Sequence, residues 1–172
     1  NAKSMASGQP GDALRVYRSA IACTGEYAQF HANQSGDAAD VAALAAIVTT
    51  LDRVNLVFDR EASLRLNLVE NNDLIIYTNS TADPYSNSNA GAILGENQEN
   101  IDDIIGNGNY DIGHVFSTGA GGLASAGLCN NTFKAQGVTG TNAPIGDPFD
   151  IDYVAHEMGH QFGANHTFNG DS

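Results

Sequence analysis

Three histidines and one glutamate near the end of the sequence have the spacing of a metal site. His156 and His160 lie four residues apart, which is about one turn of an α-helix, so both imidazoles can bind one metal ion. Glu157 follows the first histidine and can reach a metal-bound water rather than the metal itself. The spacing therefore predicts a helix that carries two metal ligands and one base.

A glycine after these residues allows a third ligand. Gly163 can adopt a positive φ, which other residues resist, so it can end the helix and turn the chain. That turn would bring His166 to the same ion. Three neutral imidazoles leave Zn²⁺ one open position for water, which is the arrangement of a catalytic zinc site. The sequence thus predicts one catalytic zinc ion.

The competing interpretation of this segment is a helix with surface histidines and a C-terminal glycine cap. We favour the zinc site, because five required positions coincide and the opposite side of the helix is apolar. The helix is expected over residues 150–163. Its apolar side contains Ile151, Val154, Ala155, Met158 and Phe162.

The chain before this helix alternates between strand and helix patterns. A long helix is expected from a cap at Asp37 to about Glu61, and a second one over residues 91–105. Strands are expected over residues 14–23, 64–68 with 74–77, 111–117 and 136–139, and residues 119–127 read as an edge strand or a loop. The inward positions of the two helices are expected to be Val41, Leu44, Val48, Leu51 and Phe58, and Ile93, Ile101, Ile104 and Ile105. This order predicts an α/β domain with a mixed sheet.

Composition and charge limit the classes of partner. The chain has 172 residues, with 7 Lys+Arg against 20 Asp+Glu and a net charge of −13. Nucleic acids and anionic membranes require clustered basic residues, so this acidity argues against both. We expect no membrane span, because no apolar run approaches the roughly 18 residues that one needs. Residues 1–12 are small and polar without a signal peptide, so we expect a disordered or processed N-terminal segment.

The metal motif also resembles the signature of a known class of enzyme. It resembles the zinc signature of the metzincin metalloendopeptidases. The residues that carry the resemblance are His156, Glu157, His160, Gly163 and His166.

The rest of the chain is similar to the reprolysin (adamalysin) branch of the metzincins. Gly121-Gly122-Leu123-Ala124 and Gly127-Leu128-Cys129 resemble the edge strand of that branch and the cysteine that follows it. Thr167 stands where reprolysins usually have Asp, and a His-Thr-Phe run is closer to pappalysin-like relatives. A pappalysin-like or other metzincin branch is therefore the alternative.

The resemblance implies a fold over residues 13–172. It is the metzincin-type zincin upper subdomain, in which a mixed, mostly parallel twisted sheet packs with two long helices and the zinc-binding active-site helix. Metzincins continue into a lower subdomain with a Met-turn, which neither Met5 nor Met158 can supply. We therefore expect a missing C-terminal part of the same enzyme to be a partner of this chain.

The resemblance also implies a function. It implies a secreted zinc-dependent endopeptidase that cleaves proteins or peptides, with Glu157 as the general base for a zinc-activated water. The substrate would pair with the edge strand at Gly122, Leu123 and Ala124. We expect an extracellular, bacterial product. The alternative is a non-catalytic binding or adhesion module on a metzincin scaffold, although retention of Glu157 and all three ligands speaks against it.

The other histidines and the two cysteines have weaker claims to a function. His31 lies in a polar stretch and is expected in a solvated loop, and His114 is expected inside a strand as a core residue or a neighbour of the metal ligands. Cys23 and Cys129 could form one disulfide. The resemblance offers the alternative that Cys129 pairs with a cysteine in the missing C-terminal part.

Two pairs of aspartates could ligate Ca²⁺. They are Asp102 with Asp103 and Asp150 with Asp152. No EF-hand or repeat spacing supports a calcium site, so a solvated acidic surface is the favoured interpretation.

Overall fold

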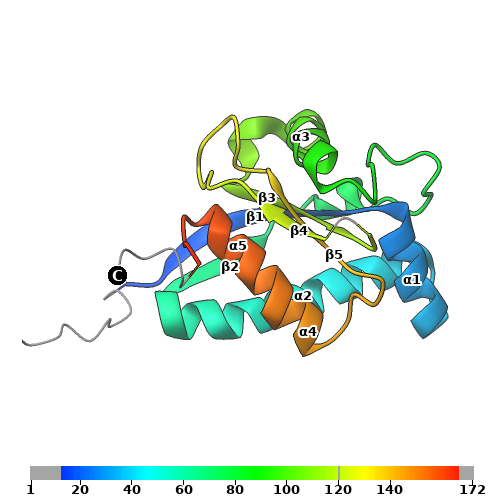
Figure 1. Cartoon of the computed structure of the whole chain (residues 1–172), viewed down its shortest axis with the longest axis horizontal. Coiled ribbons are helices and arrows are strands. Elements are labelled where there is room, and N and C mark those ends of the chain that lie inside the picture. Colours follow the sequence, from blue (N-terminus) through cyan, green and yellow to red (C-terminus); the bar gives the residue numbers. More distant parts are fainter. Residues whose placement is uncertain (1–12, 120, 167–172) are drawn as a thin grey trace, which may run out of the picture.

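The described residues are built around a mixed sheet with strand order β2-β1-β3-β5-β4 (Figure 1). The structure is a computed structural model and describes residues 13–119 and 121–166. The central strands are parallel, and β4 pairs antiparallel with β5 at one edge. The strands are β1 (Arg15–Cys23), β2 (Leu64–Leu68), β3 (Ile112–Ser117), β4 (Gly122–Ala124) and β5 (Gly137–Gly140). This sheet confirms the predicted mixed, mostly parallel α/β architecture.

Helices cover both faces of the sheet, and each face has its own core. Successive residues of a strand point to opposite faces, so Ile21 and Cys23 of β1 pack on one side and Ala20 and Ala22 on the other. The first face is covered by α1 (Gly25–Ser35), α2 (Ala39–Ala62), α4 (Asp147–Phe149) and α5 (His156–Gln161), and the second by α3 (Ala90–Ile101). Burial on both faces explains why the second half of β1, Ala20 to Cys23, is an uninterrupted apolar run.

Helix α1 was not among the expected elements. Thr24 begins it by accepting a hydrogen bond from the Tyr27 amide, and Gly36 ends it in the left-handed conformation. The prediction that His31 lies in a solvated loop is therefore wrong, because it lies on this helix. Its ring is half-buried, with its centroid 4.5 Å from that of Tyr27. The segment mixes small and polar residues, so it shows no clear apolar period.

The long helix forms close to its predicted bounds, but Ala38 and not Asp37 is its N-cap, and its buried side is rotated. Ile47, Leu51 and Val54 are buried, whereas Val41 and Val48 are 56 % and 42 % exposed. The inward prediction for those two valines is wrong, because small alanines take the core side at the start of the helix. By length and composition α2 could cross a membrane, but the core helix of a folded domain passes the same test.

Two further segments differ from expectation in their winding. Residues 74–77 were expected to be a strand, but Asn72–Ile75 forms a 3-10 helix. The second predicted helix changes from α to a wider π-helical winding at Asp102–Gly106. Ile93, Ile101 and Ile105 are buried as expected, whereas Ile104 is exposed because the wide turn shifts it outward.

Candidate metal centre

The helix that carries the motif is anchored at its beginning by a buried carboxylate. The segment Asp150–Ala155 is wound as a π-helix and continues directly into α5. Asp150 accepts a hydrogen bond of 2.6 Å from Thr50 Oγ1 and forms an ion pair of 3.0 Å with Arg53 Nε, both of α2. Val154 and Met158 are fully buried in the core. The motif therefore stands on a rigid element.

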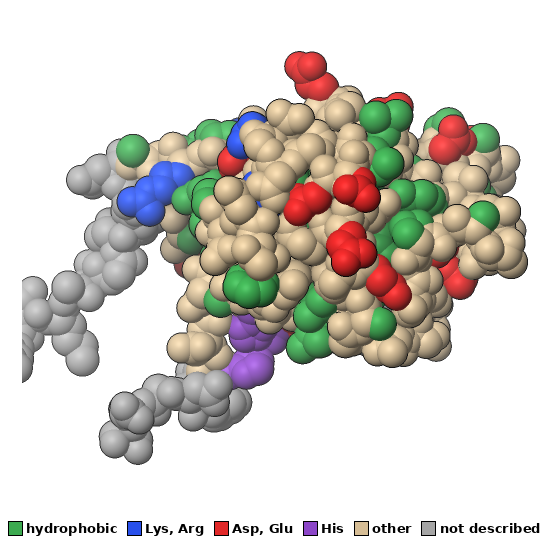
Figure 2. All heavy atoms as spheres, turned by 90° about the horizontal axis from the view of Figure 1, so that it is seen from above, with side chains coloured by type: hydrophobic (Ala, Val, Ile, Leu, Met, Phe, Trp, Pro, Cys, Tyr) green, Lys and Arg blue, Asp and Glu red, His purple; other side chains and the backbone are tan. Residues whose placement is uncertain are grey.

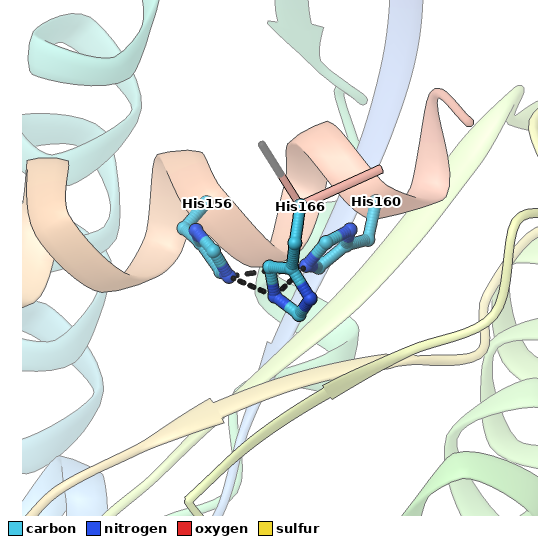
Figure 3. A group of neighbouring side chains, drawn as sticks. All are labelled: His156, His160 and His166. Atoms are coloured by element: carbon cyan, nitrogen blue, oxygen red, sulfur yellow. Dashed lines mark hydrogen bonds between the residues drawn. The ribbon is translucent and has the colours of Figure 1, made fainter. Parts of the chain in front are cut away.

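The three predicted histidines converge on one point. The Nε2 atoms of His156 and His160 lie 3.0 Å apart, those of His160 and His166 lie 3.1 Å apart, and those of His156 and His166 lie 3.2 Å apart. Two rings come from α5, and the third comes from the segment after it (Figure 3). Among the described residues they are the group that could hold a metal ion. His156 and His166 are exposed and His160 is partly exposed, and Figure 2 shows histidine side chains at the edge of the molecule.

This triangle fits a zinc ion and not a hydrogen-bond network. A neutral imidazole nitrogen carries either a hydrogen or a lone pair, so three mutually adjacent nitrogens cannot all be paired with one another. Tetrahedral Zn–N bonds of about 2.0–2.1 Å imply N···N separations of about 3.3–3.4 Å, close to those observed. His160 Nδ1 lies 2.7 Å from the Ala164 carbonyl oxygen, so it carries the hydrogen and leaves Nε2 free to bind metal.

Gly163 turns the chain as the sequence predicted. Its φ of 89° lies in the left-handed region that glycine adopts readily. The Ala164 amide then donates to the carbonyl oxygen of Gly159, and the Gly163 amide donates to that of His160. These bonds close the helix and direct His166 back toward the other two histidines.

Glu157 lies beside the edge strand. Its side chain is buried, and this burial raises its pKa while the neighbouring His160 and His166 act in the opposite direction. A Cβ atom on Gly122 would lie 2.2 Å from Glu157 Oε1, so the carboxylate packs directly on the backbone of β4. A cleft of about 350 Å³ brings Glu157, His160 and His166 together with Gly122, Leu123 and Ala124.

His114 is a core residue, and its main partner was missed by the sequence analysis. The ring is fully buried, and Nδ1 lies 2.7 Å from Oε1 of Gln161, the residue that follows the candidate ligand His160. The sequence did hold a signal, because Gln161 continues the apolar spacing of Val154 and Met158 along the buried side of the helix. A polar residue at such a position requires a buried partner.

The two cysteines do not pair with each other. Cys23 is buried, and this burial raises the pKa of its thiol to about 12, whereas Cys129 is exposed. Of the two alternatives for these cysteines, the internal disulfide is therefore wrong. A bond from Cys129 to another part of the enzyme stays a prediction.

Two of the four aspartates considered for calcium contact protein donors, whereas Asp103 and Asp152 are exposed. Asp102 accepts hydrogen bonds from Gln98, Asn107 and Tyr110, and Asp150 is buried against α2. The interpretation as a solvated acidic surface is wrong for Asp150. Acidic side chains do gather on the face that carries α3 (Figure 2).

A family model described as metallo-peptidase family M12B, reprolysin-like, matches residues 44–167, nearly three quarters of the chain. The matched range contains the three histidines and strands β2 to β5. The search of curated proteins gave no match.

Proposed function

Because the chain belongs to the reprolysin-like metallopeptidases of family M12B, we propose that it is a zinc-dependent endopeptidase working in the cleft between β4 and α5. The observation that carries the proposal is the convergence of three Nε2 atoms beside a buried carboxylate. Zinc held by His156, His160 and His166 would supply the Lewis acidity that activates water and polarises the scissile carbonyl.

Glu157 is the proposed general base. It accepts a proton from the attacking water and later passes it to the leaving amine. Burial raises its pKa, which brings the carboxylate closer to the range in which it can both accept and return a proton. Its contact with the Gly122 backbone holds the carboxylate at the cleft.

Strand β4 is the proposed substrate platform. It lies at the edge of the sheet, and among the described residues its outer side has no neighbouring strand. Gly122, Leu123 and Ala124 line the cleft together with the proposed catalytic residues. An extended peptide can therefore add to β4 as a further strand, which places its backbone beside Glu157. Proteins and peptides are the substrates that fit this geometry.

Removal and return of the metal tests the proposal. We expect the purified protein to bind one zinc ion and to cleave an unfolded protein such as casein. A chelator should abolish cleavage, and a stoichiometric amount of zinc should restore it. The competing function is a non-catalytic module, which predicts zinc binding without cleavage. Zinc content by mass spectrometry together with peptide release separates the two.

Substitution of Gly122 by alanine is expected to lower kcat by about 10²-fold, because a methyl group would displace the Glu157 carboxylate by about 1 Å. Zinc content should not change. The matched control is Gly95→Ala on α3, where a Cβ atom meets no neighbour within 4 Å. Wild-type kcat in the Gly122→Ala enzyme would show that the contact does not position the base.

Secretion and a C-terminal lower subdomain also remain proposals. Both rest on the resemblance of the zinc motif to the metzincin signature, which implies a secreted enzyme with a Met-turn beneath the metal. The parent reading frame tests both, since it should encode a signal peptide upstream and a Met-turn downstream.

A further inference from the structure

A buried chain of polar side chains runs behind the histidine cluster. His114 of β3 lies between Gln161 of α5 and Thr139 of β5, with Nδ1 2.7 Å from Gln161 Oε1 and Nε2 2.9 Å from Thr139 Oγ1. His114, Thr139 and Gln161 are 0 %, 0 % and 1 % exposed. Sequence positions 114 and 161 therefore meet in the interior, directly behind a proposed metal ligand.

The direction of every hydrogen bond in this chain is determined by the backbone. Gln161 Nε2 donates to the carbonyl oxygen of Gly113 at 2.8 Å, so its Oε1 faces the imidazole of His114. Nδ1 of His114 must then donate, which leaves Nε2 to accept from the Thr139 hydroxyl. Burial lowers the pKa of His114 to about 4, which agrees with a neutral ring in these roles.

The same chain connects the two sides of the cleft. Thr139 pairs with Gly122 in the β4–β5 ladder, and Gly122 packs on Glu157. The carbonyl oxygen of Gln161 also accepts hydrogen bonds from the amides of Gly127 and Leu128, which follow β4. A continuous path of contacts therefore links α5 through β3 and β5 to β4, and β4 in turn contacts Glu157.

The space around this chain is closed. A Cβ atom on Gly137 would lie 2.4 Å from Gln161 Oε1 and 2.5 Å from His114 Nδ1. The backbone of Gly137 therefore packs directly against both side chains. A buried, fully paired network of this kind holds its elements in one arrangement.

We propose that His114 is a positioning residue, which acts through Gln161 and Thr139 to fix the distance between the zinc-bearing helix and the substrate strand. The inference rests on the proposed peptidase function. His114 does not touch the metal site itself. Its loss should move the helix relative to β4 and thereby misplace Glu157 against the substrate, with the effect on kcat rather than on KM.

Three variants test the role of His114. His114→Asn keeps an amide donor near the Nδ1 position, His114→Leu removes both polar contacts, and Thr139→Val removes only the hydroxyl. Each is measured for kcat and KM on a peptide substrate, for zinc affinity by chelator competition, and for the visible absorption spectrum with Co²⁺ in place of zinc. Circular dichroism and urea unfolding establish that each variant is folded at the assay temperature.

The expected result is a fall in kcat of about 10–10²-fold for His114→Leu, with an altered Co²⁺ spectrum and little change in KM. His114→Asn should restore much of kcat. A folded His114→Leu protein with wild-type kcat and spectrum would overturn the proposal, and so would His114→Asn behaving like His114→Leu. If His114→Leu does not fold, the kcat and the Co²⁺ spectrum of Thr139→Val test the proposal in the same way.

The spectra also separate this inference from the proposed function. If the wild-type protein binds the metal but cleaves no peptide, the proposed function fails, and a changed Co²⁺ spectrum still supports the positioning role. If the wild type cleaves peptides and every folded variant matches it, the positioning role fails alone.

Discussion

Replacement of Glu157 by glutamine is expected to lower kcat by roughly 10²–10⁴-fold while the protein still binds one zinc ion. Glutamine has nearly the same shape, so it can retain the packing on Gly122. Its amide cannot accept a proton from the attacking water. The measurement is kcat on a peptide substrate, with zinc content determined on the same sample.

The control for this substitution is Glu99→Gln, which removes the same charge from an exposed position on α3. It should leave kcat unchanged. Peptidase activity close to wild type in a zinc-loaded Glu157→Gln enzyme would disprove the role of Glu157 as base.

Replacement of His160 by alanine should abolish cleavage and weaken zinc binding. The loss of affinity should exceed the ~10–100-fold that follows removal of a residue that only hydrogen-bonds to a metal ligand. Its Nε2 lies 3.0 Å and 3.1 Å from those of His156 and His166. Its Nδ1 also holds the Ala164 carbonyl, so the variant loses a ligand together with a contact that directs the third ligand inward.

Chelator competition measures the affinity, and His31→Asn is the control because His31 lies on α1, outside the metal group. We expect His31→Asn to bind zinc as the wild type does. Unchanged zinc affinity in His160→Ala would contradict the assignment of the metal site.

The parts of the structure that the sequence predicted depend on local patterns. The metal motif lies within eleven consecutive residues, and helix geometry with one glycine turn determines how they meet. Strands β1, β2, β3 and β5 were also predicted close to their observed bounds. Helix α1 was missed because its buried residues, Gly25, Tyr27 and Ala28, form no extended apolar period.

Other parts of the site depend on contacts between distant segments. Gly122 and Glu157 are 35 residues apart, and His114 and Gln161 are 47 apart. A single sequence holds no sign of which strand lies behind a helix, so these contacts could not be predicted. The buried side of α2 was assigned incorrectly for the same reason, because the sequence did not reveal that α1 packs against it.

The π-helical winding of Asp150–Ala155 limits how the length of this region can change in related enzymes. The anchor at Asp150 contacts α2, whereas His156 faces the other two histidines of the metal motif. The π-helical turn between them sets their relative orientation. Each residue of a regular helix turns the chain by about 100°, so deletion of one residue here would rotate the imidazoles away from β4. Insertions and deletions should therefore be excluded from this segment, whereas the loops of the same domain can vary in length.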